Sequence, residues 1–112
     1  MKITHIHTQI VKMPADEPLA NGPSTPGVTR DFVTLTIGTD EGVEGIGFSF
    51  FGGALMGALK TAIDALGALT VGEDPLKIEA IVAKLRGAAG SCGPGGIFTL
   101  ALAAIDIALW DI

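Results

Sequence analysis

Residues 30–50 read RDFVTLTIGTDEGVEGIGFSF, and this stretch decides the fold. Val33, Leu35 and Ile37 alternate with threonines, which is the pattern of a strand with one buried face. Residues 39–42, Thr-Asp-Glu-Gly, favour a turn, because their glycine tolerates a positive φ. The chain then returns through residues 43–50, and we predict an antiparallel hairpin.

The residues before the hairpin predict one more strand and a long loop. Residues 3–13 are rich in β-branched side chains, which favour a strand. Residues 14–29 contain four prolines and two glycines, a composition that supports neither a helix nor strand pairing. We therefore expect a three-stranded antiparallel meander whose first two strands are joined by this loop.

The pattern becomes helical after Gly53. Apolar residues then recur at the spacing of a buried helix face, at Leu55, Ala58, Leu59, Ala62, Ile63 and Leu66. Asp74 and Pro75 are typical of a helix cap and of the first helical position, so they predict the start of a second helix. Its apolar positions are Ile78, Ile81, Val82 and Leu85, and Gly87 is expected to end it.

A third helix is predicted for residues 97–112, which are apolar on nearly all sides and therefore typical of a buried helix. No capping glycine, proline or cationic last turn follows, so the terminal carbonyls would lack their usual partners. We expect the natural chain to continue past Ile112. The predicted fold class is α+β, a three-stranded meander followed by a helical bundle.

Composition and charge exclude several classes of protein. The 112 residues suit one small domain, and the net charge of −5 with no basic run argues against a nucleic-acid partner. No uncharged apolar run approaches the roughly 18 residues of a membrane span, and no export signal is visible. Cys92 is the only cysteine, which suits a reducing compartment. We expect a cytoplasmic protein with no membrane or nucleic-acid partner.

The last twelve residues, 101–112, read ALAAIDIALWDI. They resemble the opening of the signature of the mandelate racemase and muconate lactonizing enzyme family, which belongs to the enolase superfamily. In that signature small residues precede an aliphatic residue, an acid, Ala-Leu, an aromatic residue and a second acid. The order of the predicted strands, loop and helices also resembles the capping domain of that family over nearly the whole chain.

The resemblance implies a capping domain at residues 1–97 and a buried helix at 98–112 that leads into a catalytic domain absent from this chain. That domain would be a TIM-like (β/α)7β barrel, which binds Mg²⁺ through its own carboxylates. It would also supply the Lys or His base, so no catalytic or metal-binding residue is expected here. The implied partners are the chain's own barrel and a small carboxylate substrate, within a homo-oligomer such as a dimer or octamer.

Two loops of the family's cap close over the barrel, and they correspond here to residues 14–29 and 49–53. Long loops in a compact domain commonly have a function. Carried over by position, the candidate substrate-binding residues are Leu19, Asn21, Ser24, Thr25, Arg30, Phe50 and Phe51. Among these, Arg30 is the candidate partner for a substrate carboxylate.

Other residues that invite a functional interpretation favour a structural one. His5 and His7 share a strand face, but two ligands do not complete a metal site. The glycine-rich segment 90–96 lacks the Gly-Lys-Ser/Thr sequence of a phosphate loop. Asp106 and Asp111 lie on the third helix, where the resemblance implies a role at the junction of cap and barrel.

Two functions remain open. The first is the cap of a Mg²⁺-dependent enzyme that removes the proton α to a carboxylate, either an acid-sugar dehydratase or a racemase or isomerase. Dehydration is preferred, since the polar residues of the 14–29 loop suit a hydroxylated substrate. The alternative is a stand-alone, non-catalytic α+β domain that binds a partner through its apolar helix.

Overall fold

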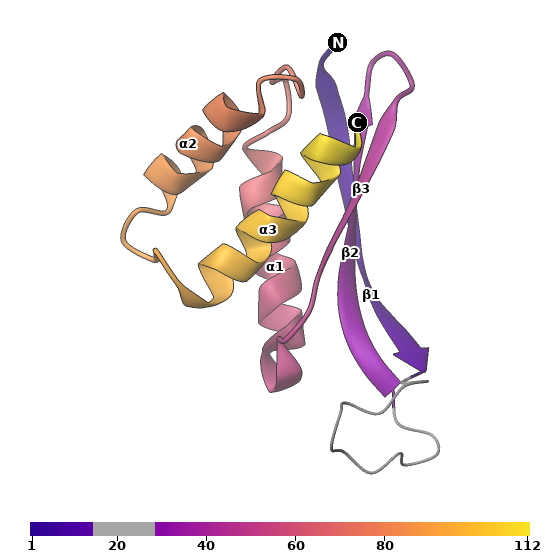
Figure 1. Cartoon of the computed structure of the whole chain (residues 1–112), viewed down its shortest axis with the longest axis vertical. Helices are drawn as coiled ribbons and strands as arrows, with labels where there is room; N and C mark the ends of the chain where they lie inside the picture. The colour runs from indigo at the N-terminus through magenta and orange to yellow at the C-terminus, as the bar shows by residue number, and fades with distance from the viewer. Residues whose placement is uncertain (15–28) are drawn as a thin grey trace.

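The computed structural model describes residues 1–14 and 29–112 as an antiparallel sheet with helices packed on one face (Figure 1). The strands, in the order β1-β2-β3, are β1 (Ile3–Pro14), β2 (Thr29–Thr39) and β3 (Glu44–Ser49). A 3-10 turn, η1 (Gly53–Leu55), precedes the helices α1 (Met56–Ala68), α2 (Ile78–Ala88) and α3 (Gly96–Asp111). α1 and α3 lie on the sheet, and α2 packs on α3. The predicted α+β meander with helices is confirmed.

The central strand carries the core as its alternation predicted. Val33, Leu35 and Ile37 are fully buried against the helices. Ile6 and Ile10 of β1 lie opposite Ile37 and Val33, so neighbouring strands present apolar residues to the same face.

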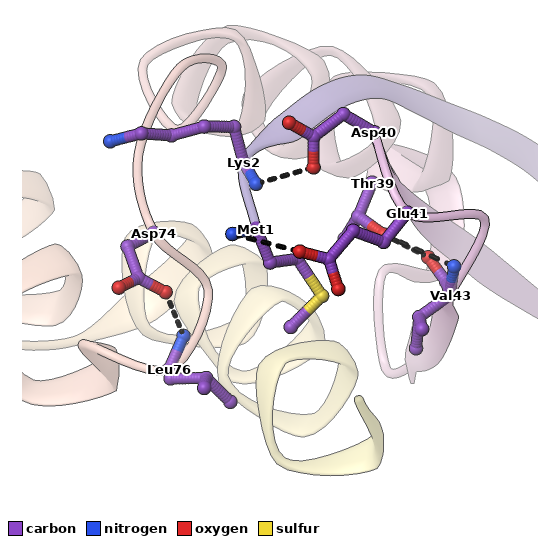
Figure 2. A network of polar contacts seen from close by, with 8 residues as sticks. All are labelled: Met1, Lys2, Thr39, Asp40, Glu41, Val43, Asp74 and Leu76. Atoms are coloured by element: carbon purple, nitrogen blue, oxygen red, sulfur yellow. Dashed lines mark hydrogen bonds and ion pairs between the residues drawn. The ribbon is translucent and has the colours of Figure 1, made fainter.

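The β2–β3 hairpin closes in a turn that also holds the start of the chain (Figure 2). Thr39 Oγ1 lies 2.9 Å from the Val43 carbonyl and accepts a hydrogen bond from the Val43 N–H at 3.1 Å. Gly42 takes the positive φ that the turn needs. The Lys2 N–H donates to Asp40 at 2.8 Å, and the N-terminal ammonium lies 3.2 Å from Glu41.

Helix α1 begins one residue later than its apolar pattern suggested. Met56, Leu59, Ile63 and Leu66 are buried, but Leu55 and Ala58, both expected on the buried face, are exposed. Asp64 of α1 accepts hydrogen bonds from the Thr8 hydroxyl of β1 and, at 2.9 Å, from Lys60. This carboxylate ties the helix to the edge strand.

The predicted start of α2 is wrong by three residues. Asp74 does not cap the helix, because its carboxylate accepts the Leu76 N–H at 3.1 Å within a separate turn (Figure 2). Pro75 is buried, and the helix starts at Ile78 with no side-chain cap. Its predicted end is also slightly wrong, since Gly87 lies inside the helix.

Helix α3 is buried on one side rather than all round. Its inner side includes Ala101, Ala104, Ile105 and Ala108, while Ala103, Ile107 and Trp110 are exposed at helical spacing. The inner side lies on β3, whose inward positions are Gly45 and Gly47. A Cβ on Gly47 would overlap the Ala104 carbonyl, and one on Gly45 would overlap the Ala108 carbonyl. Glycines on the strand therefore let the helix backbone lie directly on the sheet.

Candidate functional site

A hollow of about 660 Å³ lies at the end of the sheet where β1 stops, β2 starts and the β3–α1 connection passes. This is the lower end of the molecule in Figure 1. The described residues that line it are Lys12, Thr29, Arg30, Asp31, Phe32, Phe50, Phe51, Gly53 and Met56. Its volume is within the range of about 300–1,000 Å³ that is typical of small-molecule sites.

Aromatic rings from β2 and from the end of β3 form one wall of the hollow. The ring centroids of Phe50 and Phe51 lie 4.1 Å apart, and those of Phe32 and Phe50 lie 5.4 Å apart. Phe48 extends this cluster over the outer face of the sheet, with its ring 6.4 Å from Phe32. Offset and tilted rings at these distances attract each other, so the cluster forms a cohesive apolar surface.

Phe51 combines a strained backbone with an exposed ring. Its φ is 68°, in the left-handed region that side chains other than glycine rarely adopt, and 79% of the residue is exposed. Such a conformation costs about 1–2 kcal/mol and is concentrated at ligand-binding positions. The β3–α1 connection thus presents a large apolar side chain toward solvent beside the hollow.

Three charged residues, Lys12, Arg30 and Asp31, are among the described residues that line the hollow. Lys12 and Asp31 face each other across β1 and β2, with Nζ 3.3 Å from Oδ1. Arg30 is exposed and has no ion-pair partner among residues 1–14 and 29–112. Within the described part of the lining, two cations and one carboxylate therefore lie beside the aromatic wall.

The structure brings together the three predicted site residues that it describes. Arg30 lines the same hollow as the adjacent pair Phe50 and Phe51, although it lies 20 residues before Phe50. Leu19, Asn21, Ser24 and Thr25 lie outside the described residues. The other described residues of the lining were not predicted as site residues: Lys12, Thr29, Asp31, Phe32, Gly53 and Met56. Lys12 and Phe32 are brought to the hollow by the β1–β2 register, a tertiary feature that sets Lys12 opposite Asp31 and Val11 opposite Phe32.

The described residues do not fit a magnesium site. Among residues 1–14 and 29–112, no three His, Cys, Asp or Glu side chains lie together in a way that could hold a metal ion. The His5 ring covers Gly38, and its Nδ1 lies 2.9 Å from the Thr4 hydroxyl. His5 therefore has packing and hydrogen-bonding contacts of its own on the sheet.

The acids of α3 lie far from the hollow, toward the other end of the sheet. Asp111 accepts the N–H of Ile46, a residue of the edge strand β3, at 2.8 Å. Asp106 and Trp110 line a separate shallow hollow between α2 and α3.

In the part of the chain that the structure describes, no helix has the length and apolar character needed to span a membrane.

Comparisons with known proteins agree with this architecture. The chain is 45% identical over 84 residues to the D-galactonate dehydratase family member RspA of Cellvibrio japonicus, a match that covers 74% of this chain and 20% of that protein. It is 33% identical over 102 residues to the L-talarate/galactarate dehydratase of Salmonella typhimurium, covering 88% of this chain and 25% of the relative. The chain therefore spans about a fifth to a quarter of the length of these relatives.

A solved structure gives the same result. The L-talarate dehydratase of a Polaromonas species, complexed with Mg and L-glucarate, superposes with a TM-score of 0.80 at 28% identity. The superposition covers 97% of this chain and 31% of that protein. The family model described as "Mandelate racemase / muconate lactonizing enzyme, N-terminal domain" matches residues 5–112. The chain therefore belongs to the family of N-terminal domains of mandelate racemase and muconate lactonizing enzymes.

Proposed function

We propose that this chain is the capping domain of an enolase-superfamily enzyme that dehydrates sugar acids. The proposal rests on the hollow at the end of the sheet, which Arg30, Phe50 and Phe51 line together. The hollow lies beside Pro14 and Thr29, the end of β1 and the start of β2. The named dehydratases among the relatives support it. In this proposal the cap closes the active site and shapes the specificity for substrate.

The proposed reaction removes the proton α to a carboxylate and expels the hydroxyl group on the next carbon as water. The resulting enol then tautomerises to a 2-keto acid. We assign the base and the Mg²⁺ ligands to a TIM-like barrel outside these residues, as the resemblance to the family implies. The Mg in the Polaromonas structure supports the metal requirement.

The role of the cap is to bind and to exclude water. Phe50 and Phe51 would cover the substrate and shield the reacting carbons, which strengthens electrostatic interactions inside the closed site. Arg30 would hold a carboxylate of the substrate through its fork of N–H donors. Leu19, Asn21, Ser24 and Thr25 remain candidates for the same wall.

The exposed side of α3 supports a barrel as the intramolecular partner. On α3, Trp110 is 70% exposed and Ile107 is 39% exposed. Leu76, which precedes α2, is 68% exposed. A large apolar patch on a small domain is typical of a surface that another domain covers. In the full-length protein, we assign residues 1–97 to the cap and residues 98–112 to a helix that connects it to the barrel. We further propose that this protein is cytoplasmic and forms a homo-oligomer, either a dimer or an octamer.

The test is turnover by the full-length protein encoded by the reading frame that contains this chain. The purified protein is incubated with Mg²⁺ and a panel of sugar acids and apolar 2-hydroxy acids, and 2-keto acid formation is measured with and without a chelator. The proposal predicts chelator-sensitive formation of 2-keto acids from sugar acids. If only apolar acids react, or if the α-proton exchanges with deuterium without loss of water, dehydration is wrong and racemisation replaces it.

The same exposed helix side supports the alternative, a stand-alone domain that binds another protein. The intact mass of the native protein separates the two functions. A mass that corresponds to these residues alone would favour the interaction domain. A mass several times larger, in a protein whose frame continues into barrel carboxylates, would favour the enzyme.

A further inference from the structure

We propose that the Asp111 carboxylate closes the free edge of β3 and so prevents two copies of the chain from joining edge to edge through this strand. Asp111 lies in the last turn of α3, which packs along β3 (Figure 1). Its Oδ2 accepts a hydrogen bond from the Ile46 N–H at 2.8 Å. This role of Asp111 is independent of the proposed reaction.

The backbone of β3 has groups that a further strand could use. β3 lies at the edge of the sheet that residues 1–14 and 29–112 form, and it pairs there with β2. In an antiparallel pair, alternate residues direct their N–H and C=O groups toward the neighbouring strand and away from it. The Ile46 N–H is bonded to Asp111 and not to β2, so Glu44, Ile46 and Phe48 direct their backbone groups outward. Such an edge is a template for strand addition.

The opposite edge of the sheet, β1, has features that discourage strand addition. Its register with β2 shifts between Ile3 and His5, and it carries Lys12 and Pro14. Bulges, lysines and prolines are common means by which proteins protect an edge strand. The six residues of β3 include no lysine or proline, and they pair with β2 without a shift. The only charged side chain of β3 is at its first position, so protection in the middle of the strand comes from Asp111.

The side chains of β3 would make an open edge prone to self-association. Ile46 is 58% exposed and Phe48 is 45% exposed on the outer face of the sheet. Exposed β-forming residues with little charge favour pairing between chains. Two β3 strands related by a two-fold axis at Ile46 would be antiparallel, with Glu44 of each strand opposite Phe48 of the other. Like charges would not face each other in this arrangement, so β3 of a second copy is a suitable partner.

Asp111 occupies the position that such a strand needs. Where the two strands cross the axis, each Ile46 N–H would donate to a carbonyl oxygen of the other strand. The Asp111 carboxylate already accepts this N–H, and its negative charge would lie against the incoming carbonyl oxygen. Strand addition would therefore break a hydrogen bond to a charged acceptor, which is stronger than one to a neutral carbonyl.

The test measures the mass of the full-length protein by light scattering over a range of concentrations. Asp111→Ala is predicted to associate as the concentration rises, toward about twice the mass of the wild-type assembly. Asp111→Asn keeps an acceptor oxygen for the Ile46 N–H and should retain the wild-type mass. Asp111→Ala combined with Ile46→Pro should return to the wild-type mass, because proline has no N–H for a second strand and β2 does not use this N–H.

Asp64→Ala is the matched control for a loss of stability. It removes the acceptor of hydrogen bonds from Thr8 and Lys60 but leaves β3 intact, so its mass should equal that of the wild type. The edge-closing role is wrong if Asp111→Ala keeps the wild-type mass or unfolds instead of associating. It is also wrong if Asp64→Ala associates equally, or if Ile46→Pro does not reverse the association.

Discussion

Gly47 shows how one residue sets the distance between helix and sheet. It lies on the inner face of β3, where a Cβ would overlap the Ala104 carbonyl of α3. That obstacle is backbone and does not yield by a rotamer change. The Ala104 and Ala108 side chains on the helix are small for the same reason, since they leave room for the strand.

Gly47→Ala is predicted to destabilise the chain by about 2–3 kcal/mol, the cost of overpacking a close contact. Gly87→Ala is the matched control, because no atom lies within 4 Å of its added Cβ and the residue is inside α2. It should stabilise by up to about 1 kcal/mol. Urea unfolding of both variants measures the difference, and equal stabilities would contradict the close packing.

The substitution Phe51→Gly tests whether Phe51 contributes to function rather than to stability. The ring is mostly exposed and the backbone has a positive φ, so glycine should leave the unfolding free energy within about 1 kcal/mol of the wild type. In the full-length protein the proposed function predicts that the same change lowers kcat/KM, because a side chain of the proposed substrate-facing wall is lost. A variant that is much less stable but retains full kcat/KM would show that Phe51 has a structural role only.

At the scale of elements, the contact between α1 and β1 combines apolar packing, such as Ile6 against Gly67, with hydrogen bonds to the carboxylate of Asp64. Partial burial acts to raise the pKa of Asp64, but the hydrogen bonds from Thr8 and Lys60 and the Lys60 charge outweigh it and lower the pKa. A carboxyl group whose pKa is lowered by folding adds stability above its unfolded pKa, and this stability is lost as the pH falls through the folded pKa.

Asp64→Asn should therefore be less stable than the wild type at neutral pH, and the difference should shrink below about pH 4, where aspartate becomes protonated. Thermal unfolding between pH 7 and pH 2.5 measures it. Asp106→Asn is the control, because Asp106 has no hydrogen bond or ion pair within residues 1–14 and 29–112. A difference that stays constant across this pH range would contradict the role of the Asp64 carboxylate.

The sequence predicted the elements whose pattern is local. Val33, Leu35 and Ile37 specify β2 through alternation alone, and the 39–42 turn specifies its partner. The predicted start of α2 was wrong because the Asp74 carboxylate accepts a hydrogen bond from the N–H of Leu76, two residues later, and does not cap the helix. The exposed side of α3 was missed because apolar composition does not reveal which side has a partner within the described residues.

The candidate site was predictable only in part, for a related reason. Arg30, Phe50 and Phe51 were found through the position of the loops, and the structure brings them into one hollow. Lys12 and Met56 enter that hollow through strand register and through the start of α1, which are tertiary features. The other four candidates, Leu19, Asn21, Ser24 and Thr25, lie in residues 15–28, which the structure does not describe.

At the scale of the whole molecule, the outer side of α3 is the surface that the account assigns to the barrel. Trp110 is the only tryptophan in the chain, so its fluorescence reports on this surface. In residues 1–112 alone, the exposed indole should be readily quenched by acrylamide. In the full-length protein, the fluorescence of Trp110 is the difference between the wild type and Trp110→Phe. This fluorescence should be shielded from acrylamide.

Trp110→Lys places a charge on the same surface, one helical turn from Asp106. We expect this variant to leave the folding of residues 1–112 unchanged, because the indole contributes little to their core. It should destabilise the full-length protein, by about 2–4 kcal/mol if the indole is fully buried against the barrel. If unfolding of the full-length variant matches the wild type, another surface contacts the barrel.

We propose that the sheet end formed by Arg30, Phe50 and Phe51 closes over a substrate. Amide hydrogen exchange of the full-length protein, with and without Mg²⁺ and a sugar acid that it binds, distinguishes this from a purely structural role. On ligand binding, exchange should become slower in residues 50–56, which contain the β3–α1 connection, and should not change in residues 33–37 of the central strand β2. If exchange at residues 50–56 stays the same in a protein that demonstrably binds the sugar acid, the proposed closure is wrong.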